Sequence, residues 1–213
     1  MATRFPAPRR NNDPHASLPP EGASAPLGRP GGRRIDLLVI HCSATPDGRW
    51  LWPADVDRWH RERGFRRQGE ARRAYNPDFS SLGYHWLILP NGGRPSGRHP
   101  LEVGAHARAR GANHRSLGLC LVGSGRYTAA AWEALADQVA FLCDKFKIPR
   151  RFAQASNGFT GVCGHRDLSP DRDGDGVVEP HEFVKTCPGF SVADWLAGGL
   201  EPLAGHVLEA VSA

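Results

Sequence analysis

The segment "IDLLVIHCSAT", residues 35–45, indicates the class of fold to which this chain belongs. Side chains alternate between the two faces of an extended strand. Leu37 and Val39 therefore lie on one face, and Leu38 and Ile40 lie on the other. A strand that is apolar on both faces is typical of a sheet that is covered on both sides.

Further strands and helices alternate with this one along the chain. Three more strands are predicted, at residues 83–89, 116–125 and 159–165. Three helices are predicted, at residues 53–64, 128–148 and 191–199. The longest helix carries Trp132, Leu135 and Val139 at spacings of three and four, which is the pattern of an amphipathic helix. This alternation predicts an α/β domain with a central mixed sheet flanked by helices.

The first 34 residues differ in composition from the rest. They hold seven Pro and four Gly and few large apolar side chains, which predicts a disordered tail (1–34) before a single folded domain (35–213). With six Arg, one Asp and one Glu, this tail carries a charge of +4, which leaves +1 of the net +5 for the rest of the chain. A near-neutral body argues against a nucleic-acid-binding domain. The arginines within residues 61–73 suggest a solvated face or, alternatively, attraction to an anionic polymer. A monomer is expected.

The chain contains five cysteines, an odd number, and residues 1–30 lack the apolar stretch of a signal peptide. No later segment reaches the length of a membrane span. We therefore expect synthesis in the reducing cytoplasm without a signal peptide, with free or metal-bound thiols.

Three residues stand where metal ligands could lie. His41 and His165 each end a predicted strand, and Cys187 precedes Pro188 in a loop. Imidazole and thiolate together suit zinc better than calcium or magnesium. Spacing alone is weak support, because a histidine is more often an ordinary polar or core residue than a ligand.

The surrounding motifs are more specific. "VIHCSAT", "RWHRERGF", "GYHWLI", "GAHARARGANHRSLGLCLVG", "GHRDL" and "KTCPGF" occur in this order within residues 35–197. This region resembles the zinc-dependent N-acetylmuramoyl-L-alanine amidases, the family that includes bacteriophage endolysins and peptidoglycan recognition proteins. The resemblance implies a central sheet flanked by helices, a zinc ion in a surface groove, and peptidoglycan as the partner.

The resemblance also implies residue roles. It implies that zinc is bound by His41, His165 and Cys187. It implies that Tyr84 and Lys185 assist catalysis and that His106 lies near the substrate. Two histidines and one cysteine would leave the fourth tetrahedral position for water, which zinc acidifies for attack on the amide carbonyl.

Two neighbouring residues leave alternatives open. Cys163 lies two residues before His165 and would share its side of a strand, so a closed site with four protein ligands is an alternative that excludes catalysis. Asn113 is expected to fix a turn before the following strand rather than to bind substrate.

A second metal-binding pattern lies within "DRDGDGVVEPHE", residues 171–182. It follows the spacing of a calcium loop, with a glycine, Gly176, at the sixth position. The expected calcium ligands are Asp171, Asp173, Asp175, the Val177 carbonyl and Glu182. The alternative is an acidic, solvated loop without an ion.

The leading hypothesis is an enzyme, a peptidoglycan amidase of the phage or prophage endolysin type that acts on the cell wall after release. The alternatives are a cytosolic amidase that recycles anhydro-muropeptides and a non-catalytic peptidoglycan-binding module. The presence of Cys187 favours an enzyme, because relatives that only recognise peptidoglycan lack the zinc cysteine.

Overall fold

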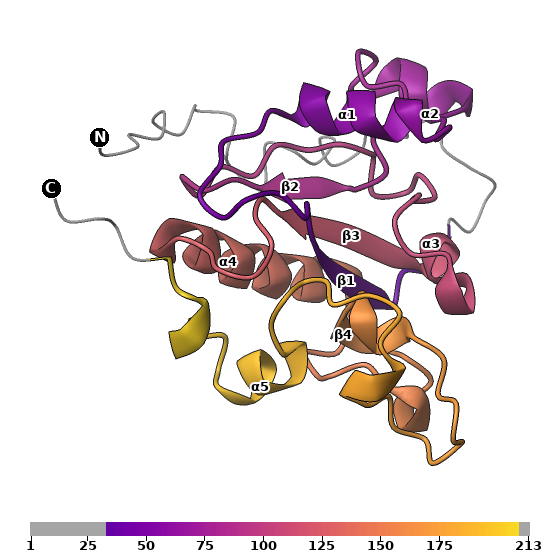
Figure 1. Ribbon diagram of the computed structural model, residues 1–213. Helices are drawn as coiled ribbons and strands as arrows, with labels where there is room; N and C mark the ends of the chain where they lie inside the picture. The colour runs from indigo at the N-terminus through magenta and orange to yellow at the C-terminus, as the bar shows by residue number, and fades with distance from the viewer. Residues whose placement is uncertain (1–32, 209–213) are drawn as a thin grey trace, which may run out of the picture.

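A four-stranded sheet forms the centre of the computed structural model, which describes residues 33–208 (Figure 1). Its strands lie in the order β2-β3-β1-β4. They are β1 (Leu37–Cys42), β2 (Trp86–Ile88), β3 (Ser116–Leu121) and β4 (Gly161–Gly164). The predicted α/β class with a central, helix-flanked sheet is confirmed. The predicted tail 1–34 lies outside the described residues except for its last two positions.

The sheet was expected to be mixed, but all three of its strand pairs are parallel. In the described part of the chain, antiparallel pairing is confined to one isolated bridge, between Trp86 and Ser96. Parallel neighbours require crossover connections, and those joining these strands are long and contain most of the helices.

One face of the sheet is covered by α4 (Ala129–Phe146) and α5 (Val192–Ala197), as Figure 1 shows. Trp132 and Trp195 from these helices are fully buried in a cluster with Leu38 and Ile40 of β1. Both helices begin at polar capping residues. The Thr128 side chain accepts a hydrogen bond from the amide of Ala131, and Ser191 caps α5 in the same way.

The opposite face is covered by two smaller groups. The helix α1 (Pro53–Glu62) packs over β2, and Leu37 and Val39 of β1 are buried among loop residues that include Phe159. The predicted two-faced character of β1 is therefore confirmed. Two short helices were not predicted, α2 (Gly69–Ala74) and α3 (Ala112–Arg115), because neither has a full apolar stripe. Single 3-10 turns are η2 (Ala109–Gly111), η3 (Ala155–Asn157), η4 (Arg166–Leu168), η5 (Pro180–Glu182) and η6 (Ala204–His206).

Arg33 ties the start of the described chain to the sheet. Its guanidinium donates to the carbonyls of Pro100, Asn113 and Ser116 at 2.7–3.2 Å. Burial lowers the pKa of Arg33 to about 10, so the side chain remains charged at neutral pH. Within residues 33–208, no helix has the length and apolarity needed to cross a membrane.

Candidate active site and metal centre

Two parallel strands and one loop bring three metal-binding side chains together. His41 is near the carboxyl end of β1, and His165 directly follows β4, the strand that pairs with β1. The backbone amide of His165 donates a hydrogen bond to the Ile40 carbonyl at 3.0 Å. The loop carrying Cys187 is held by a 2.9 Å bond from the Arg166 amide to the Cys187 carbonyl. One donor atom from each of His41, His165 and Cys187 lies within 4.8 Å of the other two.

The environment of this trio favours a metal ion of zinc type. Burial and then the neighbouring His106 hold the pKa of His41 well below its usual value, and burial followed by Lys185 lowers that of His165. Both imidazoles are therefore neutral and able to donate a lone pair at neutral pH. Hydrogen bonding with Cys42 and burial raise the pKa of Cys187, so a bound cation is needed to hold its thiolate. Two imidazoles and a thiolate are the donor set that zinc prefers.

His106 lies in a narrow slot against the sheet. Its Nδ1 is 3.0 Å from Nε2 of His41, and its ring passes between two glycines. A Cβ atom on Gly118 would lie 2.6 Å from Cγ of His106, and one on Gly104 would lie 2.5 Å from Cδ2. The Asn113 side chain accepts hydrogen bonds from the backbone amides of His106 and Ala107, so Asn113 holds this loop. The two glycines make room for an imidazole that contacts the metal-binding trio.

Tyr84 reaches the same place from the segment before β2. Its ring centroid is 5.1 Å from that of His41 and 6.3 Å from that of His106. Burial, followed by the nearby thiols, raises the pKa of Tyr84 well above its usual value. The phenol is therefore protonated at neutral pH and can donate a hydrogen bond.

The helix α1 holds the chain that leads to Tyr84. Asp57 accepts hydrogen bonds from the amides of Ser81 and Leu82 at 2.6 and 2.7 Å, and Nδ1 of His60 accepts from the amide of Gly83 at 2.9 Å. Two side chains one helical turn apart thus bind three consecutive amides.

The ring of His60 also packs against Tyr84, with centroids 5.2 Å apart. Burial and then Arg63 and Arg98 lower the pKa of His60 to about 4, so it is neutral here. Neither Asp57 nor His60 was predicted from the sequence as part of the site. The available signal was a pair of polar side chains on the buried face of α1.

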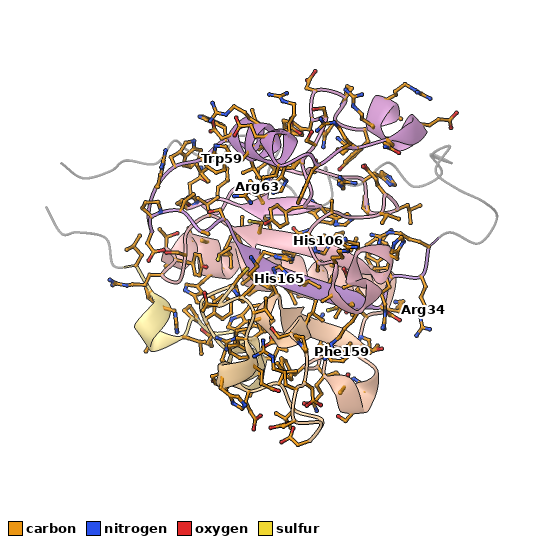
Figure 2. The ribbon with its side chains drawn as sticks, turned by 45° about the vertical axis from the view of Figure 1, so that its right-hand side comes forward. Arg34, Trp59, Arg63, His106, Phe159 and His165 are labelled. Carbon is orange, nitrogen blue, oxygen red and sulfur yellow. The ribbon has the colours of Figure 1, made fainter. Side chains whose placement is uncertain are left out.

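Lys185 is exposed and lies close enough to His165 to contribute to its lowered pKa. An open pocket of about 440 Å³ adjoins the site, lined by the residues that follow β1 and by α1. Its walls include Thr45, Arg49, Trp59 and Arg63. Figure 2 shows Trp59 and Arg63 on the α1 side and His165 nearer to β4.

Cys163 does not join the trio. It is fully buried in the cluster that contains Leu37 and Val39. Cys163 and His165 were expected to share one side of a strand. However, β4 ends at Gly164, and His165 has helical backbone angles (φ −60°, ψ −35°), so the strand alternation does not extend to it.

The three aspartates of the predicted calcium loop are also close together. Carboxylate oxygens of Asp171, Asp173 and Asp175 lie within 4.8 Å of one another. Glu182 is buried at the end of η5, and its carboxylate accepts hydrogen bonds from the amides of Arg172 and Glu179. These bonds lower the pKa of Glu182. Such bonding also serves a purely structural cap, so calcium binding stays a prediction.

Comparison with known proteins gives a match over most of the chain. The family model for N-acetylmuramoyl-L-alanine amidase matches residues 31–190. An uncharacterised protein of Haemophilus influenzae is 40% identical over 109 residues, which are 47% of this chain and 83% of that protein. The endolysin of Escherichia phage T7 is 29% identical over 168 residues, covering 75% of this chain and 84% of the endolysin.

A solved structure has a similar fold. The N-acetylmuramoyl-L-alanine amidase LysC from Clostridium intestinale aligns with a TM-score of 0.53 and 21% identity. The alignment covers 79% of this chain and 86% of LysC. At this identity the likeness concerns the fold alone.

Proposed function

The chain belongs to the N-acetylmuramoyl-L-alanine amidase family, and we propose that it is an endolysin that uses zinc held by His41, His165 and Cys187. Family membership makes it a hydrolase of peptidoglycan, acting on the amide between N-acetylmuramic acid and L-alanine. The endolysin role is supported by the similarity to the phage T7 endolysin over 84% of that protein's length. The observation that carries the zinc assignment is the convergence of two neutral imidazoles and one thiol within 4.8 Å.

A bound zinc ion would supply a water molecule of lowered pKa and polarise the amide carbonyl. The remaining work falls to the protein. Tyr84 keeps its proton and would donate a hydrogen bond to the oxygen on which negative charge develops. The exposed ammonium of Lys185, beside His165, would stabilise the same charge. The contact of His106 with His41 supports a role for His106 beside the substrate.

The pocket beside the site supports the binding of a polymer segment. It is open to solvent and combines the indole of Trp59 with the guanidinium groups of Arg49 and Arg63 and the single carboxylate of Glu62, so its charge is positive on balance. Such a surface offers an apolar platform for a sugar ring or side chain and positive charge for carboxylates of a stem peptide.

Mass spectrometry of digested peptidoglycan tests the bond specificity. We expect free N-terminal L-alanine and intact glycan strands from whole sacculi. Cleavage between sugars would contradict the amidase assignment. Turnover of soluble anhydro-muropeptides with no turnover of sacculi would replace the endolysin with a recycling enzyme.

Metal analysis tests the zinc site. The purified protein should hold about one zinc per chain, and Cys187→Ser should lose both zinc and activity, because the site has only three protein ligands and the variant removes one of them. Cys143→Ser, a change in a buried cysteine of α4, is the matched control. Full activity of Cys187→Ser, or of protein stripped of zinc, would contradict the assignment.

The calcium loop needs its own test. If residues 171–182 bind calcium, isothermal titration of zinc-loaded protein should show binding, and Asp173→Ala should abolish it. No heat of binding at millimolar calcium would leave Glu182 as a backbone cap only.

A further inference from the structure

Two cysteines far apart in the sequence touch at the edge of the metal-binding trio. Cys42 is the last residue of β1, and its backbone amide donates to Sγ of Cys187 at 3.1 Å. This bond holds Sγ of Cys187 against the backbone of Cys42, next to the residue's own thiol. The proposed role of Cys187 as a zinc ligand uses its thiolate but gives no task to the thiol of Cys42.

The loop that carries Cys187 is fixed in this position. The hydroxyl of Tyr127 donates to the Pro188 carbonyl at 2.6 Å. Gly189 packs so closely on the loop at Ser124 that a Cβ atom there would lie 2.3 Å from the Ser124 carbonyl oxygen. The approach of the Cys187 sulfur to Cys42 is therefore built into the packing of this loop.

Access also distinguishes this pair. Cys42 and Cys187 are both partly exposed, whereas Cys120, Cys143 and Cys163 are buried. Two accessible cysteines in contact offer what oxidation to a disulfide needs, reach for an oxidant and a second sulfur nearby.

We propose that Cys42 and Cys187 form a reversible disulfide in the zinc-free protein and that this bond shuts the metal site. With a peroxide as oxidant, one thiol attacks the O–O bond, becomes a sulfenic acid and releases water. The second thiol then attacks that sulfur, the S–S bond forms, the S–O bond breaks, and a second water leaves. Two sulfur atoms together lose two electrons, and the peroxide gains them. A dithiol reverses the reaction.

The consequence rests on the proposed function, because it requires Cys187 to be a zinc ligand. A disulfide sulfur is not a thiolate and no longer binds zinc, so the trio is reduced to two histidines. Zinc bound first would occupy Cys187 and protect the pair. Protein that enters an oxidising compartment with zinc bound would then stay active, whereas protein that enters it without zinc would form the disulfide and be inactive.

The experiment uses the full chain, both zinc-loaded and stripped with a chelator. Each form is treated with hydrogen peroxide, the remaining thiols are alkylated, and peptides are mapped without reduction. We expect a peptide linking Cys42 to Cys187 in the zinc-free form, a loss of two of the five thiols, and much slower reaction in the zinc-loaded form. Zinc rebinding, measured with a chromogenic chelator, should fail after oxidation and return after dithiothreitol.

Two variants sharpen the result. Cys42→Ser keeps a hydrogen-bond donor but cannot form the disulfide, so its zinc rebinding should survive peroxide, relative to its own untreated sample. Cys143→Ser, in α4, should behave as the parent chain does. A Cys42→Ser protein as sensitive as the parent would overturn the proposal, because Cys187 would then be oxidised without a partner.

The two proposals fail separately. If the stripped protein yields no linked peptide after peroxide and can still rebind zinc through Cys187, only the disulfide proposal is overturned. A disulfide that forms while zinc affinity is unchanged would overturn both the shut-off and the assignment of Cys187 as a ligand.

Discussion

Adding a single methyl group at Gly118 tests whether the sheet was built to accept His106. The Cβ of an alanine there would lie 2.6, 2.7 and 2.8 Å from Cγ, Cδ2 and Nδ1 of the imidazole. Real Cβ atoms do not approach other atoms this closely, so the ring has to move. The backbone of Gly118 is not in the left-handed region, so the methyl group itself causes no backbone strain.

The magnitude follows from two opposing effects. Overpacking a well-filled interior costs about 1–3 kcal/mol. In a strand without a clash, alanine is favoured over glycine by about 0.5–1 kcal/mol. Gly118→Ala should therefore destabilise the parent chain but should be neutral or stabilising in a His106→Ala background. The alanine gain is common to both backgrounds and cancels, so the coupling between the two changes should be about 1–3 kcal/mol.

Urea unfolding of zinc-free protein at neutral pH measures this coupling across the four chains of the cycle. Gly205→Ala is the control, because a Cβ atom there would meet no atom within 4 Å. Additive effects of the two changes would refute the slot as the reason for glycine at position 118. In the single variant, displacement of His106 should also weaken zinc binding, because His106 bonds to His41.

Three further predictions follow from the same geometry. Tyr84→Phe and Lys185→Ala should each lower turnover by about 10²–10³ with zinc content unchanged, since loss of one oxyanion donor typically costs that much; unchanged turnover in both would give them structural roles only. His60 has a pKa of about 4, below its ordinary 6.5, so its stabilising effect is complete above about pH 6.5 and is lost as pH falls towards 4. His60→Gln should therefore reduce the pH slope of the unfolding free energy in that window by up to about 1.4 kcal/mol per pH unit, and an unchanged slope would contradict the shift. A chain that starts at residue 33 should have the same melting temperature as the full chain. A chain that starts at residue 35 should have a melting temperature several degrees lower, because it lacks the buried hydrogen bonds of Arg33. Equal melting temperatures of the two shortened chains would show that Arg33 adds no stability.

Local patterns predicted the frame of the molecule well. The apolar residues of β1 alternate strictly, and the structure buries Leu38 and Ile40 against α4 and Leu37 and Val39 on the other face. The direction of neighbouring strands was not predictable in this way. Alternation of apolar and polar residues shows which face of the sheet a side chain occupies, but it does not show the direction of the neighbouring strand. A mixed sheet was therefore expected, whereas the strand pairs in the structure are parallel.

The trio of His41, His165 and Cys187 was identified through motifs, and its convergence depends on pairing that no motif contains. The β1–β4 register sets Ile40 beside Gly164, and only then do His41 and His165 become neighbours. The contacts of His60 and the slot around His106 were missed for the same reason, since each requires knowledge of which backbone approaches which ring.

The small residues of β3 connect the fold to the proposed chemistry. Val39 pairs with Gly118, and His41 pairs with Cys120, so β3 presents small side chains beside the first metal-binding residue. This leaves room on the sheet for the imidazole of His106, and the thiol of Cys120 lies near enough to Tyr84 to help raise its pKa. A larger residue at position 118 would fill the space that the His106 ring occupies. The alternation of large and small residues in "SLGLCL" thus serves two requirements, a packed core under α4 and an open floor beneath the site.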